Sequence, residues 1–201
     1  IIQKGDVLPW LYEYEGIVPP LTLLTVGAKG IGVNVTSPEP DAVVRKMPVL
    51  IRVGDKIYPS MLLENIRIVN RSKRIKVVAK EYGINEVLVS KQAGIPVNHN
   101  AEMYINYADP SQYTQLSVEQ VFSREHDDKI KGRIVVVGMD AAGLSVLKYT
   151  PHGLTTDQMI TAQALDTTMT GDYLYRTPQA DTYEIVFMSF LLLLLIIIII
   201  K

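Results

Sequence analysis

The chain has 201 residues, of which 48% are hydrophobic and 20% charged, and its 20 basic and 21 acidic residues give a net charge of -1. This amount of apolar side chain is enough for one sizeable core, so a single globular domain is expected. The balanced charge provides no overall field that would recruit nucleic acid or an anionic membrane, and the absence of cysteine excludes disulfides and thiolate chemistry.

The first part of the chain has the pattern of β-strands. Small or apolar residues alternate with polar residues over 32–35, and a second such run follows over 47–53. Gly54 and Asp55 tolerate positive φ between two β-prone arms, which predicts a hairpin turn. This region is therefore expected to supply strands of a sheet.

A helix is predicted over residues 59–83. Leu62, Ile66 and Val69 recur there at helical spacing, and Gly83 is placed to end the element. Short strands are predicted after this helix, within 87–89 and 103–107, because turn residues separate these two apolar runs.

Further along, a short helix and a buried strand are predicted. Ser117 and Gln120 fit the capping box that opens a helix. Residues 134–137 are four β-branched residues in a row, a pattern typical of a strand that is covered on both faces.

The last helix of the predicted domain begins near Thr156 or Asp157 and ends at Gly171. Its inner side is expected to carry Met159, Ala162, Leu165 and Met169. Taken together, the elements predict an α/β domain, a mixed sheet with flanking helices.

The tail of the chain predicts a membrane helix. Residues 185–200 carry no charge, and a full span needs roughly 20 apolar residues. Tyr183 stands where interfacial aromatic side chains lie. The predicted organisation is a domain over 1–182 whose N-terminal part lies before Ile1, followed over 183–201 by the start of a transmembrane helix.

The stretch "GRIVVVGMDAAG", residues 132–143, tests whether the chain binds a nucleotide. A dinucleotide-binding turn needs glycine where Asp140 stands, and a carboxylate there would repel the pyrophosphate. A phosphate-binding loop of the Walker type needs a lysine and a hydroxyl residue after its last glycine, and this chain has Leu144 and Ser145 there. No hydrolase nucleophile motif is present either, so catalysis by this chain is not expected.

Two consecutive stretches carry a family resemblance. "KGRIVVVGMDAAGLSVLKYTPHG" followed by "MITAQALDTTMTG" resembles the second type of the CHASE domain, the cyclase and histidine-kinase associated sensory extracellular family. Upstream, "GVNVTSPEPDAVVRKMPVLI", "YPSMLLE" and "IPVNHNAEMYINY" follow in the family's order, so the resemblance covers roughly 30–171. Thr161 stands where the family usually has histidine, and Ala42 and Ala101 stand where it often has glycine, which implies slightly different turns.

The resemblance implies an extracytoplasmic sensory domain of a receptor in the bacterial inner membrane, on its periplasmic or extracellular side. Such domains are usually followed by a cytoplasmic adenylate or guanylate cyclase, a histidine kinase or a protein kinase. The expected partners are the membrane and an unknown small ligand or protein. A homodimer is expected because a single membrane helix has no neighbour to move against, and no cofactor and no nucleic acid are expected. A membrane-surface assembly module that senses nothing small is the alternative.

Five residues are candidates for contacting a ligand. Asp140 follows the predicted buried strand, where open α/β sheets place ligands, and Thr150 and Gln163 are polar groups expected near that end. Asp41 and Arg45 match the family's aspartate and arginine, although their spacing also fits a local ion pair. No metal site is predicted, because the three histidines lack the spacing of metal ligands: His99, His126 and His152.

Overall fold

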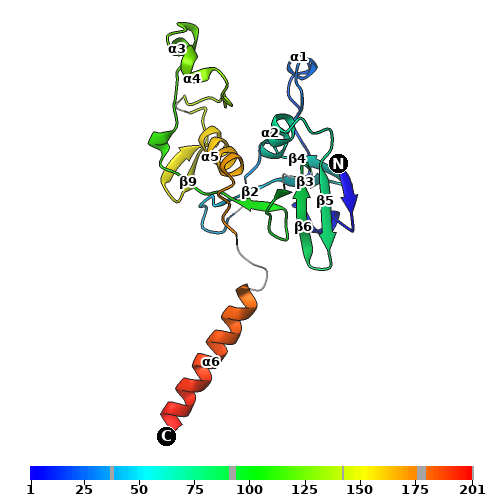
Figure 1. The fold of residues 1–201 in the computed structure, drawn as a ribbon, viewed down its shortest axis with the longest axis vertical. Coiled ribbons are helices and arrows are strands. Elements are labelled where there is room, and N and C mark those ends of the chain that lie inside the picture. Colours follow the sequence, from blue (N-terminus) through cyan, green and yellow to red (C-terminus); the bar gives the residue numbers. More distant parts are fainter. Residues whose placement is uncertain (37–38, 91–93, 142, 176–179, 201) are drawn as a thin grey trace.

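The protein consists of a head built from several small sheets and a separate C-terminal helix, α6 (Ala180–Ile200) (Figure 1). The structure is a computed structural model, and it describes residues 1–36, 39–90, 94–141, 143–175 and 180–200. The mixture of helices and sheets confirms the predicted α/β class.

The largest sheet has four strands in the order β1-β5-β6-β7: β1 (Ile2–Lys4), β5 (Lys76–Lys80), β6 (Gly83–Leu88) and β7 (Gly94–Ile95). β1 runs parallel to β5, and the other neighbours are antiparallel. Along β5, Val77 and Ala79 are buried and both terminal lysines are exposed, so one face of this sheet packs on the core.

The hairpin predicted around Gly54 is confirmed by β3 (Leu50–Val53) and β4 (Lys56–Pro59), which pair antiparallel across a turn where Gly54 has φ 55°. Helix α2 (Met61–Val69) follows directly. Ser60 caps it, because its hydroxyl accepts a hydrogen bond from the Leu63 amide at 3.3 Å. The other strand predicted here, over 32–35, forms only an isolated bridge from Val33 to Ser60.

The prediction of one helix over 59–83 is correct only for its first part. The helix ends at Val69, and Arg71 takes a left-handed conformation with φ 51° that reverses the chain. Beyond residue 75 the pattern has a period of two, and the chain forms the β5–β6 hairpin. Gly83 therefore begins a strand and ends no helix.

A second group of elements surrounds α5 (Asp157–Thr170). β9 (Leu147–Thr150) and β10 (Gly153–Thr156) form a hairpin that leads into α5, and β2 (Lys46–Pro48) pairs with β8 (Glu102–Tyr104) between the two groups. The short elements are α1 (Thr22–Val26), α3 (Val118–Phe122), α4 (Asp127–Ile130) and the 3₁₀ helices η1 (Leu8–Trp10) and η2 (Pro110–Gln112). The predicted capping box is present, since Ser117 and Gln120 bond to each other's backbone at the start of α3.

Helix α5 has the predicted bounds, and Gly171 caps it in the left-handed conformation with φ 78°. The predicted inner face is only partly correct. Leu165 is buried, but Met169 is 52% exposed. The buried face is instead markedly polar, and it consists of Ile160, Thr161, Gln163, Ala164, Leu165 and Thr167.

The prediction that residues 134–137 form a buried strand is wrong. They lie in a stretch without strand, turn or bend, and Val135 and Val137 are 55% and 86% exposed. Only Val136 packs against the core. The β-branched pattern describes the preference of the chain for an extended conformation, but no neighbouring strand in the described residues lies alongside to cover it.

The two alanines at positions where the family often has glycine both have positive φ, 60° at Ala42 and 59° at Ala101. Glycine adopts this region at no steric cost, whereas an L side chain is strained there. The turns therefore keep the backbone conformation that glycine favours.

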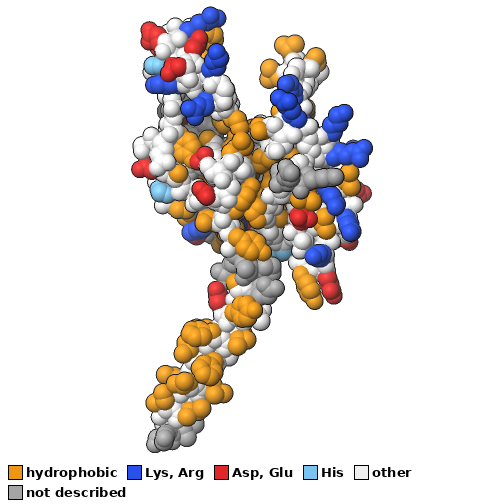
Figure 2. All heavy atoms as spheres, viewed as in Figure 1, with side chains coloured by type: hydrophobic (Ala, Val, Ile, Leu, Met, Phe, Trp, Pro, Cys, Tyr) orange, Lys and Arg blue, Asp and Glu red, His pale blue; other side chains and the backbone are white. Residues whose placement is uncertain are grey.

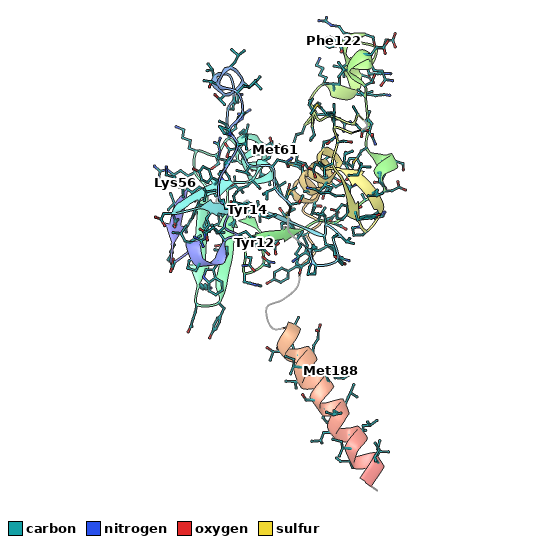
Figure 3. The ribbon with its side chains drawn as sticks, turned by 180° about the vertical axis from the view of Figure 1, so that it is seen from behind. Tyr12, Tyr14, Lys56, Met61, Phe122 and Met188 are labelled. Atoms are coloured by element: carbon teal, nitrogen blue, oxygen red, sulfur yellow. The ribbon has the colours of Figure 1, made fainter. Side chains whose placement is uncertain are left out.

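On the face shown in Figure 2, hydrophobic side chains cover most of helix α6, and its residues 185–200 carry no charge. Its residues Thr182–Ile199 are long and apolar enough to cross a membrane, and none of them is buried against the head. In Figure 3, Phe122 on α3 lies at the tip of one arm of the head, at the opposite end of the molecule from Met188 on α6. The predicted C-terminal membrane helix is thus present as a candidate span.

Candidate functional site

The C-terminal half of α5 forms one wall of a cavity of about 280 Å³. The opposite wall comes from the segment that follows β8. Asp172, the residue after the helix cap Gly171, also lines the cavity. The lining residues are Asn106, Tyr107, Ala108, Gln112, Asp166, Thr167, Thr170 and Asp172.

Hydrogen bonds fasten the two walls to each other. The Thr167 hydroxyl accepts from the Asn106 amide at 3.1 Å and donates to the Gln163 carbonyl at 2.9 Å. The Tyr113 hydroxyl donates to Asp166 Oδ2 at 2.9 Å. Thr170 lies four residues after Asp166 and three after Thr167, so these side chains share one face of α5, and all three line the cavity.

Two buried polar atoms without a hydrogen-bond partner belong to Tyr107, which lines this cavity, and to Gln163, which bonds to the lining residue Ala108. Gln163 is 1% exposed, and its Oε1 has no partner among the residues that the structure describes. Its Nε2 lies 3.4 Å from the carbonyl of Ala108, which lines the cavity. The Tyr107 hydroxyl is also buried without a partner in the described chain, and burial raises the pKa of this phenol. Such orphaned groups are costly in the unliganded protein.

The cavity is negatively charged. Asp166 and Asp172 both line it, and neither forms an ion pair within the described part of the chain. Burial, together with the neighbouring Asp166, raises the pKa of Tyr113 to about 12, so this phenol stays a donor at neutral pH. No lysine or arginine lines the cavity. The arrangement favours a ligand that donates hydrogen bonds.

A second cavity, of about 250 Å³, lies at the other end of α5. The exposed segment around Val137 forms one side, and Met61, Asp157 and Thr161 contribute to the rest. Thr161, at the position where the family usually has histidine, is buried, and its hydroxyl donates to the Asp157 carbonyl at 2.9 Å. This hydroxyl is therefore already used within α5.

None of the five predicted site residues lines the first cavity; Gln163 comes nearest, since its amide bonds to the carbonyl of the lining residue Ala108. Asp140 is exposed and directly follows Met139, which lines the second cavity. Thr150 is buried, and its hydroxyl donates to the Gly153 carbonyl at 2.8 Å, which closes the β9–β10 turn.

The other two candidates, Asp41 and Arg45, form a surface ion pair of 2.7 Å. A bridge between Val43 and Tyr149 places this pair beside β9 and away from the first cavity. The hydrogen bonds from Arg45 and from the Val43 amide lower the pKa of Asp41 to about 2. The geometry is that of a turn held by a local ion pair. A role of these residues in ligand contact stays a prediction.

Tyr107, Asp166 and Asp172 were not among the predicted site residues. Tyr107 lies 59 positions before Asp166 in the sequence, so nothing in the pattern joins them until the segment after β8 packs on α5. The spacing of Gln163 and Asp166 on one helix face was the only available signal.

The cavity lining offers carboxylates, amides and hydroxyls, all of which form hydrogen bonds, and no histidine or lysine is among the lining residues. Among the described residues, no three His, Asp or Glu side chains come together in a way that could hold a metal ion.

The family model for the CHASE2 domain matches residues 1–199, nearly the whole chain. Domains of this family are extracellular sensory domains of signalling receptors and are not catalytic. Comparison with curated proteins and with solved structures returned no match.

Proposed function

The chain belongs to the CHASE2 domain family, and from this we propose that it detects a ligand outside the membrane and passes a conformational signal through α6 to a cytoplasmic effector. The effector in this proposal is an adenylate or guanylate cyclase or a histidine kinase. The membrane is the bacterial inner membrane, with the head on its periplasmic or extracellular side.

The connection between the α5 cavity and α6 is the observation that carries the proposal. Thr170 and Asp172 line the cavity at the end of α5, and α6 begins at Ala180. Tyr173, between them, packs against the core. A ligand that shifts the end of α5 therefore acts on the chain within ten residues of the membrane helix, over a chain length of at most about 35 Å.

To carry a signal across a membrane, a transmembrane helix must move relative to a neighbouring helix. A single helix has no neighbour to move against, so the proposal includes a homodimer in which two α6 helices shift or rotate relative to each other. Ligand binding would change the populations of two such arrangements.

A disulfide lock between the two helices tests the transmission step. These 201 residues contain no cysteine, so Tyr183→Cys introduces the only thiol of this chain, placed to pair with the same position in a second copy. In the full-length receptor, oxidation is expected to fix effector output at one level, and reduction to restore the original response. A cysteine in place of Tyr82, 82% exposed in the β5–β6 turn, is the matched control and should leave output unchanged. Equal output from the locked and reduced receptors would contradict the proposal.

A second candidate function, an assembly module that binds a protein at the membrane surface, is supported by one observation. Val135, Val137 and Met139 are 55%, 86% and 65% exposed in neighbouring positions. Exposed apolar surface of this kind marks protein contacts. If Val137→Asp removes a copurifying partner while the Tyr183 lock leaves output unchanged, this function replaces the first.

A further inference from the structure

The four-stranded sheet carries lysines on the face that is turned away from the core. Lys76 and Lys80, at the two ends of β5, are exposed on this face. β1 runs parallel to β5, and its register pairs Lys4 with Val78, so Lys4 lies on the same face. The sheet therefore brings together cationic side chains from two distant parts of the sequence.

The loop between α2 and β5 extends this charged face. Residues 70–75 contain three exposed cationic side chains and no acid, and they lead directly into Lys76. The basic face is defined by six residues: Lys4, Arg71, Lys73, Arg74, Lys76 and Lys80. Figure 2 shows lysine and arginine side chains gathered along this side of the head.

The charge of the basic face is not balanced by its surroundings. None of its six side chains forms an ion pair within the described residues, whereas Arg67 on α2 is paired with Glu64. Among the residues of β1, β5 and β6, only Glu86 is acidic. Since the whole chain has a net charge of -1, the positive excess belongs to this one surface. Such a surface attracts an anionic partner.

The shape of the basic face favours an extended partner over a small anion. Its cations are spread along one side of a sheet and a loop, and none of them lines either of the two cavities described above. A small anion would therefore find no enclosed site there, whereas a flat surface with many negative charges could meet several of these side chains at once.

The membrane is the extended surface that α6 places beside the head. Five residues of chain separate Tyr175 from the start of α6 at Ala180, a distance of at most about 18 Å. The β5–β6 hairpin points toward the same end of the molecule as α6 (Figure 1). Tyr82 at the tip of this hairpin is 82% exposed, and tyrosine is enriched where proteins meet lipid headgroups.

We propose that the basic face lies against the headgroups of anionic lipids in the membrane that α6 crosses, with Tyr82 at headgroup level. Each lysine or arginine near an anionic bilayer favours contact about fivefold, and salt weakens this attraction. The contact would hold the head in one orientation on the bilayer. The inference depends on α6 crossing a membrane and does not depend on the signal proposed above.

A fluorescent label near the hairpin tip tests the contact. Asn85→Cys, exposed on β6, introduces the only thiol of these 201 residues. The labelled full chain is placed in nanodiscs of phosphatidylglycerol or phosphatidylcholine that contain a lipid with a nitroxide headgroup, which quenches the label on close approach. Stronger quenching is expected in phosphatidylglycerol, and high salt should remove the difference. Equal quenching in the two lipids would overturn the proposal.

Charge variants test whether the basic face makes this contact. Lys76→Gln combined with Lys80→Gln is expected to lower the ratio of bound to free heads about 25-fold. Both side chains are exposed and unpaired in the described chain, so the melting temperature should not change. Lys129→Gln combined with Lys131→Gln, an equal change of charge at exposed positions of the other arm, is the matched control. Equal losses in the two double variants would show that the basic face is not the contact.

Free glycerol phosphate separates a lipid surface from a soluble anion. It carries the phosphate chemistry of the headgroup without the bilayer, so it should reduce quenching no more than sodium chloride of the same ionic strength does. Displacement of the head by glycerol phosphate beyond this salt effect would assign a discrete phosphate site and overturn the membrane contact.

Discussion

The sheet that contains β5 and β6 and the segment 134–139 have similar apolar sequences and opposite environments. Val77 and Val87 in the sheet are fully buried, whereas Val135 and Val137 in the segment are more than half exposed. β5 and β6 are hydrogen-bonded to each other and their valines belong to the buried core, whereas the segment has no strand neighbour among the described elements and packs on the core only through Val136. A hydrophobic run therefore predicts extended conformation, but burial depends on a second element that the local pattern does not name.

The buried apolar surface of the sheet and the exposed apolar surface of the segment also differ in what they contribute to stability. In the sheet, burial stabilises the fold by about 25 cal/mol per Å² of surface removed from water. In the segment the same side chains contribute little to the head itself and remain available for contact with another surface.

The largest expected effect comes from truncating one side chain of the buried core, to which the sheet valines also belong, and one exposed side chain of the segment. Leu63→Ala removes a fully buried side chain on α2 and is expected to lower the free energy of unfolding by about 2–5 kcal/mol. Val137→Ala removes an 86% exposed side chain and should stay within about 0.5 kcal/mol. Urea unfolding of both variants in detergent micelles measures the difference. A comparable loss at Val137 would show that the segment is covered in the protein and would break the comparison.

Much of the fold could be predicted where local signals were complete. The turn at Gly54, the capping box at Ser117 and the cap at Gly171 are set by residues within one turn of each other, and all three are present. The helix over 59–83 was overextended because Leu62, Ile66 and Val69 fit a helix up to a break at Asn70 that no proline or glycine marks.

The site was harder to predict because its two walls are distant in sequence. Gln163 was selected for its position on the last helix of the domain, and the structure buries it behind the cavity lining, with its amide bonded to the Ala108 carbonyl. Asp140 was selected for following a buried strand, and that reason is lost because the strand does not form. Tyr107 carries no local signal, since its hydroxyl is buried without a partner only once the residue packs against the core.

A smaller change in stability is expected from relieving backbone strain at an exposed residue with positive φ. Ala42 is exposed and has φ 60°, so its cost lies in conformation and not in burial. Ala42→Gly is expected to stabilise the chain by about 0.5–1 kcal/mol, because glycine relieves the strain but is more flexible when unfolded. The control Ala28→Gly, exposed and with ordinary φ, should be slightly destabilising in the same thermal unfolding measurement. Equal shifts in the two variants would contradict the strain.

The smallest effect concerns the exposed pair of Asp41 and Arg45, whose side chains are 52% and 44% exposed. Solvent screens such a pair, so Asp41→Asn is expected to lower the melting temperature only slightly near neutral pH. The pair depresses the pKa of Asp41 in the folded chain from 3.8 to about 2. A depressed carboxyl pKa stabilises the fold above the unfolded value and loses this contribution as pH falls through the folded value.

The difference in melting temperature between the unaltered chain and Asp41→Asn should therefore be constant above about pH 5 and shrink between about pH 4 and pH 2. A scan of melting temperature against pH for the two chains measures it. Asp55→Asn, an exposed acid in the β3–β4 turn, provides the control for general acid effects. If the difference in melting temperature persists unchanged to the lowest pH, the contribution of Asp41 comes from its turn geometry and not from its charge. The contribution would then be conformational, like the one expected at Ala42.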